Sequence, residues 1–204
     1  MNKINYQKEL DKIIDNLNGE VPKLFLHSCC APCSSYTLEY LNNYFDITVY
    51  YFNPNISPKA EFDKRYAEQK RLIEALPSKH PIKLVCGEYD YNNFLEIAKG
   101  YEDVPEGGER CFRCYRMRLE STAKLAKEQE FDYFCTTLSI SPLKNSQKIN
   151  EIGYEVAEKY GIKWLPSDFK KKEGYKRSIE LSREYQLYRQ NFCGCIFSKE
   201  NKDE

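Results

Sequence analysis

Short apolar runs alternate with longer polar segments along most of the chain. Runs of about four to eight apolar or aromatic residues predict buried strands, whereas apolar positions about three or four residues apart predict helices. The expected strands are residues 23–27, 47–52, 82–85, 131–138 and 162–165. The expected helices are residues 8–17, 32–43, 58–76, 91–99, 111–127, 146–160 and 175–189. In the third helix, Ser57 is the expected N-cap and Pro58 the first helical residue.

This alternation predicts an α/β fold, with a mostly parallel, doubly wound sheet of the Rossmann-like or HUP-like kind and helices on both faces. The sequence has no internal repeat and no linker long enough to divide it. We therefore expect a single domain over residues 1–198 and a disordered, charged tail over residues 199–204. Ligands of such sheets bind at the carboxyl ends of the strands.

Composition narrows the functional classes. The 31 basic and 31 acidic residues balance, so any contact with nucleic acid must depend on a local patch rather than on an overall field. No apolar run reaches the ~18 residues that a membrane span needs, and the N-terminus lacks the apolar segment of a signal peptide. These features predict a cytoplasmic protein with no membrane partner.

The nine cysteines carry most of the candidate chemistry, because clustered cysteines in a reducing compartment more often bind metal or do redox work than form structural disulfides. Seven of them fall in three groups. The groups are Cys29-Cys30-Ala31-Pro32-Cys33 after the first strand, Cys111-Phe112-Arg113-Cys114 at a helix start, and Cys193-Gly194-Cys195 near the C-terminus. Cys86 and Cys135 stand alone in strand-like runs and are expected to be small buried hydrophobic residues.

Cys111 and Cys114 have a spacing that lets two thiolates at a helix start reach one metal. Together with Cys29 and Cys30 they supply four thiolates, enough for a tetrahedral zinc ion or a four-iron cluster. Adjacent cysteines suit the several metal corners of a cuboidal cluster better than a single zinc ion. A zinc ion that only stabilises the fold is the alternative.

Cys193-Gly194-Cys195 suggests a different use of sulfur. The glycine permits the tight ring that a disulfide between these residues would need. Such a ring is strained and readily reduced, which suits a reversible store of two electrons. The alternative is two ordinary cysteines near a frayed end.

The three cysteine groups together resemble the QueH-type epoxyqueuosine reductases, which use no cobalamin. Two further stretches are similar to that family. They are Ser167-Asp168-Phe169-Lys170-Lys171 with Gly174-Tyr175, and Tyr188-Arg189-Gln190. The resemblance runs from about residue 23 to residue 196, nearly the whole chain, and the set is specific although no single motif is.

The resemblance implies removal of the epoxide oxygen from epoxyqueuosine in tRNA. It further implies a [4Fe-4S] cluster held by Cys29, Cys30, Cys111 and Cys114. Cys193 and Cys195 would then be a catalytic, redox-active pair, supplied by an external electron donor. Cys33 would hold a second metal ion, for which iron is the candidate, or face the substrate.

Conversion of an epoxide to an alkene consumes two electrons and two protons, so a protonated side chain should assist the departure of oxygen. Asp168, at the expected end of the last strand, is the first candidate and His27 the second. The alternatives are a helix N-cap or solvated turn for Asp168 and a buried, hydrogen-bonded histidine for His27.

Contacts to tRNA phosphates require local positive charge, and chemistry on a nucleoside favours an unstacked base held by an aromatic side chain. The substrate-binding candidates are Lys170, Lys171, Tyr175 and Arg113. Further basic candidates are Lys172, Lys176, Arg177, Arg183, Arg189, Arg110, Arg116 and Arg118, and further stacking candidates are Tyr115 and Phe169. The alternative is that these charges form an ordinary solvated surface.

Three rival functions remain. Cys30-Ala31-Pro32-Cys33 before a helix also fits a thioredoxin-like thiol–disulfide oxidoreductase, although that function leaves the other groups unused. An ATP-using tRNA sulfur-transfer enzyme would need a glycine-rich loop after the first strand, and Ser28 to Ser35 contains no glycine, so no nucleotide cofactor is expected. A zinc module that binds RNA without catalysis is the third.

Overall fold

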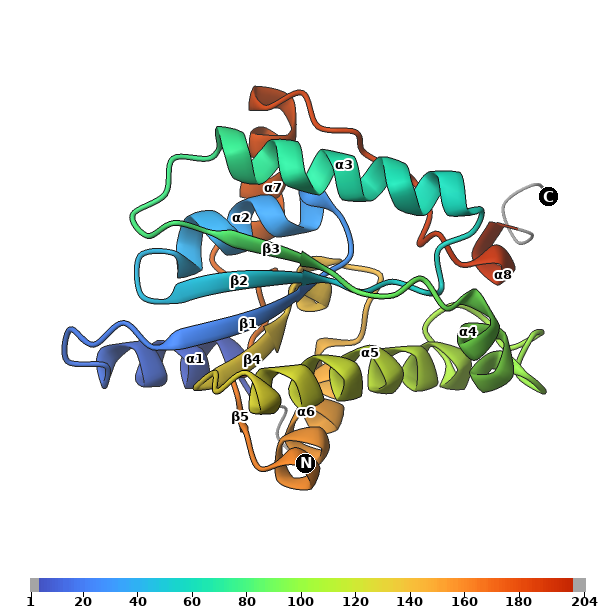
Figure 1. Ribbon diagram of the computed structural model, residues 1–204, viewed down its shortest axis with the longest axis horizontal. Coiled ribbons are helices and arrows are strands. Elements are labelled where there is room, and N and C mark those ends of the chain that lie inside the picture. The colour runs from blue at the N-terminus through green and yellow to red at the C-terminus, as the bar shows by residue number, and fades with distance from the viewer. Residues whose placement is uncertain (1–3, 200–204) are drawn as a thin grey trace.

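The computed structural model describes residues 4–199, and these form a five-stranded sheet in the order β3-β2-β1-β4-β5 with every pair parallel (Figure 1). The strands are β1 (Lys23–Ser28), β2 (Asp46–Tyr51), β3 (Lys83–Cys86), β4 (Tyr133–Thr136) and β5 (Lys163–Trp164). The helices are α1 (Tyr6–Asp15), α2 (Ala31–Leu41), α3 (Lys59–Ala75), α4 (Tyr91–Ala98), α5 (Glu109–Glu128), η1 (Thr137–Ile140), α6 (Ser146–Tyr160), α7 (Gly174–Glu184) and α8 (Ile196–Lys199).

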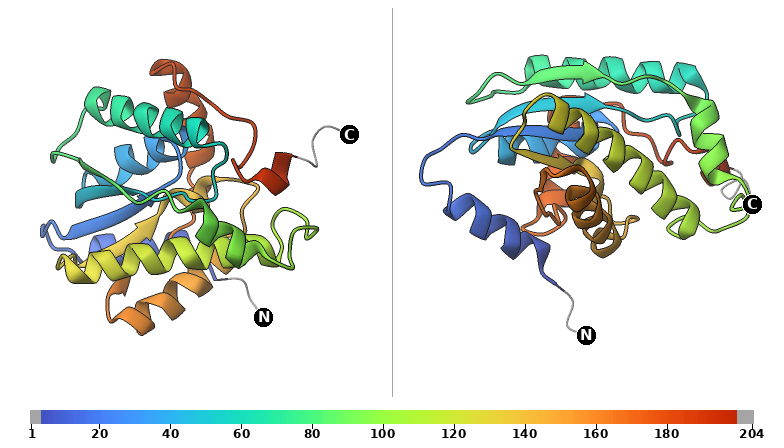
Figure 2. Two further views of the ribbon diagram at one scale, coloured as in Figure 1. Left: turned by 45° about the vertical axis from the view of Figure 1, so that its right-hand side comes forward. Right: turned by 60° about the horizontal axis from the view of Figure 1, so that its bottom comes forward.

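Helices cover both faces of the sheet, as the sequence predicts (Figure 2). Successive side chains of a strand point to opposite faces, and β1 shows this directly. Leu24 and Leu26 join the core that includes residues of α1, α2 and α3, whereas Phe25 joins the core that includes residues of α5 and α6. Because both faces are covered, the central strands are apolar along nearly their whole length rather than alternating with polar residues.

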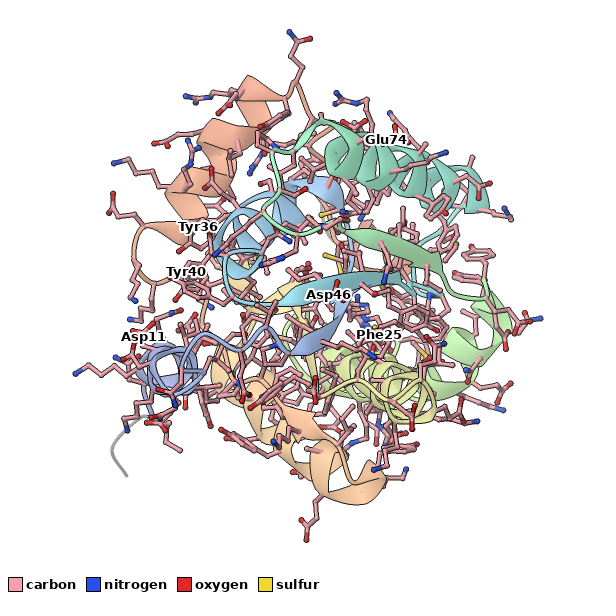
Figure 3. The ribbon with its side chains drawn as sticks, turned by 60° about the vertical axis from the view of Figure 1, so that its left-hand side comes forward. Asp11, Phe25, Tyr36, Tyr40, Asp46 and Glu74 are labelled. Atoms are coloured by element: carbon pink, nitrogen blue, oxygen red, sulfur yellow. The ribbon has the colours of Figure 1, made fainter. Side chains whose placement is uncertain are left out.

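Helix α1 lies outside the alternating strand–helix series and is held by α2. Tyr36 and Tyr40 stack on one side of α2 with ring centroids 5.9 Å apart. The Tyr40 hydroxyl donates a hydrogen bond to Asp11 of α1 over 3.2 Å (Figure 3). Lys172, from the loop before α7, pairs with the same carboxylate. The N-terminal helix is therefore joined to the side of the molecule where α7 begins.

Several expected boundaries are wrong for identifiable local reasons. The expected strand 131–138 ends at Thr136, because its hydroxyl accepts a hydrogen bond from the Leu138 amide and begins the 3₁₀ helix η1. The expected helix 175–189 ends at Glu184, and Gln186 has a positive φ that interrupts it. Pro58 rather than Ser57 is the N-cap of α3. Cys135 is buried as expected, but Cys86 is exposed at the end of the short strand β3.

Lys199, the first residue of the expected tail, is instead the last residue of α8. Residues 1–3 and 200–204, which contain the rest of that expected tail, lie outside the described residues. Within residues 4–199, no helix has both the length and the apolar content needed to cross a membrane.

The strand order changes direction between β1 and β4, and this determines where a ligand binds. Helix α2, which follows β1, packs on one face, whereas α6, which follows β4 and η1, packs on the other. Such a change leaves a crevice at the carboxyl ends of the two strands. The segments that leave those ends are Cys29-Cys30 after β1 and Thr137–Ile140 after β4.

Candidate functional site

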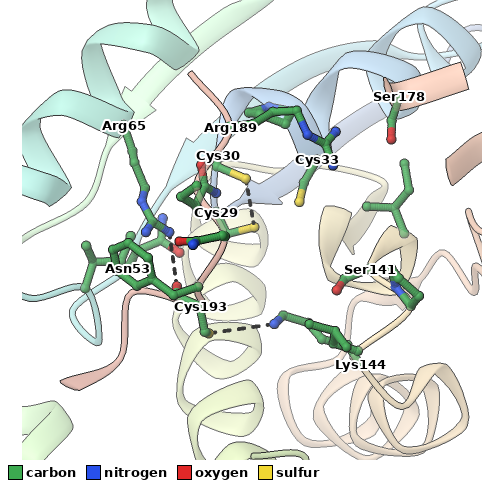
Figure 4. A pocket seen from close by; sticks show the side chains of 18 of the residues that line it. Cys29, Cys30, Cys33, Asn53, Arg65, Ser141, Lys144, Ser178, Arg189 and Cys193 are labelled. Atoms are coloured by element: carbon green, nitrogen blue, oxygen red, sulfur yellow. Dashed lines mark hydrogen bonds between the residues drawn. The ribbon is translucent and has the colours of Figure 1, made fainter. Parts of the chain in front are cut away.

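A cavity of about 330 Å³ occupies this crevice (Figure 4). Its walls come from the β1–α2 turn, the loop after β2, the segment from η1 to α6, the start of α7, and the chain after α7. The lining side chains used below are Cys29, Cys30, Cys33, Asn53, Arg65, Arg118, Lys144, Tyr175, Arg189 and Cys193. Segments distant in sequence therefore meet around three adjacent cysteines.

The sulfur atoms of Cys29, Cys30 and Cys33 all lie within 4.8 Å of one another, and Cys29 and Cys30 are 3.8 Å apart. Cys30 is the extended N-cap residue of α2, with Pro32 at the helix start, so the chain turns sharply between β1 and α2. This turn brings Cys33, in the first turn of the helix, back to the two cysteines that follow the strand. Three soft thiol ligands at this separation can hold a metal ion.

The pKa values of the three thiols depend on one another. Hydrogen bonds from Cys30 and Cys33 lower the pKa of Cys29 well below its usual value, an effect that burial opposes and that Lys144 and Arg118 reinforce. Interaction with Cys29 raises the pKa of Cys30 to about 12, and also raises the pKa of Cys33. A metal ion would replace the remaining protons and bind all three as thiolates.

The second pair of expected ligands does not join this group. Cys111 and Cys114 lie in the first two turns of α5, where the Gly107 amide donates to the Cys111 sulfur over 3.2 Å. Burial raises the pKa of both thiols, that of Cys114 to about 11. Cys193 acts electrostatically on both of them, and Cys114 packs with Cys195. The structure thus gathers one group of three cysteines and a second group of four.

Two buried arginines beside the cysteines are incompletely hydrogen-bonded, and Arg118 has no carboxylate partner among residues 4–199. Arg118 of α5 is 1% exposed, and its hydrogen bonds go to Oδ1 of Asn53 and the carbonyl of Cys114. Arg65 is 2% exposed and binds Glu61 and the carbonyl of Cys193. One terminal nitrogen of each guanidinium has no hydrogen-bond partner among residues 4–199. Burial opposes the charge of Arg118, but Cys114, Cys193 and Cys29 together raise its pKa.

These features fit an anionic metal–sulfur group. Thiolate ligands add negative charge, which an unpartnered buried cation would stabilise. Arg118 interacts electrostatically with Cys29 of the first group and with Cys114 and Cys193 of the second. The donor set and the two incompletely bonded guanidinium groups therefore agree with the metal chemistry expected from the sequence.

Lys144 is a site residue that sequence reasoning missed. Its ammonium lies 3.7 Å from the sulfur of Cys193 and lines the cysteine cavity (Figure 4). Burial acts to lower its pKa, but Cys193, Tyr115 and Cys29 raise it above its usual value. A usable signal was present in the sequence. Lys144 directly precedes Asn145, the N-cap of α6, where the helix dipole disfavours a cation.

Asp168 and Lys170 line a different cavity of about 560 Å³, together with Lys171 and the first turn of α6. Lys170 Nζ lies 3.0 Å from Asp168 Oδ1 and donates to the carbonyl of Ser139 over 2.9 Å. Lys144 lines this second cavity as well as the first. Asp168 is therefore adjacent to the cysteine cavity and is not part of its wall.

His27 is fully buried in β1 and hydrogen-bonded at both ring nitrogens. Nε2 lies 3.0 Å from the carbonyl of Phe52, so it carries the proton, and Nδ1 accepts from the Thr136 hydroxyl at 2.8 Å. Burial, with a further contribution from Arg118, lowers its pKa to about 3. His27 is thus a neutral structural residue, which agrees with the alternative stated for it above.

Only some of the side chains expected to contact the substrate line the cysteine cavity. Tyr175 lines the cysteine cavity, and so does Arg189. Arg113 lines neither cavity and stacks on Tyr101 of the loop before α5. The expectation that Arg110 and Arg118 contact phosphate is wrong, because both are buried, and Tyr115 and Phe169 are too buried to stack an entering base.

Comparison with known proteins agrees with the resemblance noted in the sequence. Residues 24–201 match the family described as epoxyqueuosine reductase QueH. Epoxyqueuosine reductase QueH of Staphylococcus epidermidis is 48% identical over 202 residues, which cover 96% of this chain and 85% of that protein. The QueH of Thermotoga maritima is 35% identical over 178 residues, which cover 86% of this chain and 89% of that protein.

Among solved structures, the U34-tRNA thiolase NcsA from Methanococcus maripaludis, with its [4Fe-4S] cluster, aligns with a TM-score of 0.53. The alignment covers 95% of this chain and 67% of the thiolase at 13% identity, so the likeness concerns the fold alone. The sequence comparison goes further, since the family match spans residues 24–201, a range that contains the cavity-lining residues and all three cysteine groups. The chain belongs to the epoxyqueuosine reductase QueH family.

Proposed function

We propose that the protein is a cytoplasmic enzyme that reduces the epoxide of epoxyqueuosine in tRNA to the cyclopentene of queuosine, with a [4Fe-4S] cluster and a redox-active dithiol. Each turnover requires two electrons and two protons, breaks both C–O bonds of the epoxide, and releases water. The observation that carries this proposal is the group of three thiols lining a cavity beside two incompletely bonded, buried guanidinium groups.

We assign the cluster to Cys29, Cys30, Cys111 and Cys114, and we assign Cys33 to a second iron ion. A bound cluster would supply electrons one at a time. Two observations support the assignment. Cys33 lies within 4.8 Å of Cys29 and Cys30, which supports a second iron ion beside those ligands, and Arg118 interacts with cysteines of both groups, which supports a cluster that both groups share. The paired residues Cys193 and Cys195 remain for the two-electron store, and an external electron donor would restore their thiols.

The chain's own side chains would orient the substrate. Tyr175 is 36% exposed, and it lines the cavity at the start of α7, where it can stack on the modified base. Lys171 is exposed beside the second cavity, and Lys170 lies between Asp168 and Ser139. We assign these lysines and Arg113 to contacts with tRNA phosphates. The ion pair with Lys170 holds Asp168 in the second cavity. From there Asp168 would help to deliver protons to the site rather than contact the epoxide.

The experiment uses protein purified without oxygen. Iron, zinc and sulfide are measured, the visible spectrum is recorded before and after dithionite, and tRNA carrying epoxyqueuosine is added. We expect a brown protein whose colour bleaches, and a nucleoside that loses one oxygen atom by mass spectrometry. Serine variants of Cys29, Cys30, Cys111 and Cys114 should lose iron and activity together.

Cys86→Ser is the matched control, because this thiol is exposed and lines neither cavity. It should keep iron content and turnover. A colourless protein that contains zinc and leaves the nucleoside unchanged would contradict the reductase mechanism and favour a zinc-containing RNA-binding module. Retention of all iron by the four serine variants would contradict the ligand assignment.

A further inference from the structure

Lys144 occupies a position that links the two cavities. Its side chain lines the cysteine cavity, where Nζ lies 3.7 Å from the sulfur of Cys193, and it also lines the second cavity beside Asp168 and Lys170. Its backbone is fixed on both sides. The Lys144 amide donates to the Ser141 carbonyl over 3.1 Å, and the next residue, Asn145, caps α6. The backbone at Lys144 is therefore fixed, and from it the side chain reaches the Cys193 sulfur.

Nothing in the local structure explains this lysine as a stabilising residue. No carboxylate among residues 4–199 forms an ion pair with it, and its polar side-chain contact there is the Cys193 sulfur. It also lies next to the positive end of the α6 dipole, where a cation is unfavourable. A half-buried ammonium with no carboxylate partner, beside a thiol, is a candidate for chemistry rather than for stability.

His27, Asp168 and the cavity arginines are less suitable as proton donors. His27 is neutral, and both of its ring nitrogens are engaged. Asp168 does not line the cysteine cavity. Arg65 and Arg118 are at the cavity, but a guanidinium does not release its proton in proteins. Lys144 combines a transferable proton with a place beside both the thiols and the space for the substrate.

We propose that Lys144 protonates the departing epoxide oxygen and takes the replacement proton from the Cys193 thiol. This inference rests on the function proposed above. In one turnover the Cys193 and Cys195 thiols form a disulfide and release two electrons and two protons. The two C–O bonds break, a C=C bond forms, and the oxygen leaves as water with both protons, one of which passes through Lys144. The electrons and protons that later reduce the disulfide come from the external donor and, through the second cavity, from solvent.

The test is a single-turnover assay of the iron-loaded, prereduced enzyme with tRNA carrying epoxyqueuosine. The variants are Lys144→Ala, Lys144→Arg and, as a matched control one turn into α6, Lys148→Ala. Loss of a general acid costs roughly 10²–10⁴-fold in rate, and we expect losses in that range for both Lys144 variants. Iron content, titratable thiols and the Kd for tRNA should stay within about twofold of the wild type.

Chemical rescue separates proton transfer from charge. Small primary alkylamines should restore turnover to Lys144→Ala but not to Lys144→Arg, and the rescued rate should depend on the pKa of the amine. Full activity of Lys144→Arg would show that charge alone suffices and would overturn the proposal. So would loss of iron or of tRNA affinity in proportion to the rate.

The proposed function and this inference fail in different ways. A wild-type enzyme that leaves the nucleoside unchanged overturns both. A wild-type enzyme that reduces the nucleoside while Lys144→Ala does so equally fast overturns the role of Lys144 alone.

Discussion

The guanidinium of Arg118 donates a hydrogen bond to Oδ1 of Asn53 over 3.3 Å, and the Asn53 amide in turn donates to the carbonyl of Ser28 over 2.8 Å. This chain of hydrogen bonds connects α5 to the end of β1, directly before Cys29. It orients a buried cation toward the cysteines without neutralising it, since neither partner carries a charge. Burial of this charge costs desolvation free energy, which an anionic group bound to the thiols would offset.

Arg118→Met should therefore have opposite effects on the metal-free and the metal-loaded protein. Without metal, removal of an unneutralised buried charge should raise the free energy of unfolding by on the order of 1 kcal/mol. The same change should lower the iron bound per chain, because the thiolates lose a compensating charge. Urea unfolding of the metal-free protein and iron analysis after reconstitution measure the two effects.

Arg116→Met is the control for that prediction. Arg116 lies on the same helix, but its side chain is 42% exposed and paired with Glu155. It should change stability by less than about 0.5 kcal/mol and leave iron content unaltered. If Arg118→Met lowered the free energy of unfolding of the metal-free protein, the hydrogen bonds of Arg118 would contribute more to stability than its buried charge costs. The argument that Arg118 is a counter-cation would then fail.

His27 should make the protein sensitive to mild acid. Its pKa falls from 6.5 to about 3 on folding, so between these pH values the unfolded chain binds a proton that the folded protein does not bind. Its contribution to stability is present above pH 6.5 and is lost progressively as the pH falls toward 3. Between pH 7 and pH 5 this one group should cost on the order of 2 kcal/mol in the free energy of unfolding.

Urea unfolding of the metal-free protein at pH 7 and pH 5 measures that loss, and His27→Gln should reduce the pH dependence by the same amount. His80→Gln, at the only other histidine, is the matched control and should keep the wild-type difference. Equal pH dependence in wild type and His27→Gln would show that other groups cause the acid sensitivity.

The sequence predicted the parts of the fold that depend on local pattern. Apolar runs and helical spacing located all five strands and the helices from α1 to α7, because both faces of the sheet are covered and the core positions are regular. The boundaries failed where a side chain replaced a backbone partner, as at Thr136, or where a left-handed residue ended a helix, as near Gln186. Neither event changes the apolar pattern, so periodicity does not detect it.

The sequence predicted which cysteine groups belong to the site, but not the distances between them. The cysteine groups indicated metal and redox chemistry, but spacing along the chain does not show how α5 lies against β1. The sequence therefore left the role of Cys33 open, and the structure places its sulfur within 4.8 Å of those of Cys29 and Cys30. For the same reason Arg118 was taken for a phosphate contact, although it is buried. Lys144 was missed because its signal, a lysine directly before a helix N-cap, is not part of any motif.

Gly174→Ala should destabilise the protein, because a Cβ there would overlap the carbonyl oxygen of Phe169 and the ring of Tyr36. Overpacking of this kind costs about 1–3 kcal/mol, and each kcal/mol lowers Tm by about 2–4 °C in a chain of this size. Thermal unfolding gives the shift. Lys176→Ala, on the exposed part of the same helix, should change Tm by no more than about 2 °C, and an unaltered Tm in Gly174→Ala would mean that α7 can move away from α2.

Tyr175 and Lys171 should both contribute to tRNA binding, and the salt dependence of the affinity should distinguish stacking by Tyr175 from a phosphate contact by Lys171. Tyr175 lines the cysteine cavity, so Tyr175→Ala should weaken binding by about 1–3 kcal/mol through lost stacking, while Tyr175→Phe stays near wild type. Lys171 is exposed beside the second cavity, and loss of a phosphate contact in Lys171→Gln should reduce the slope of log K against log salt by about one. Filter binding from low to moderate salt measures both. The Tyr175→Ala line should run parallel to wild type, because stacking releases no counterions, and a changed slope in that variant would contradict a stacking role.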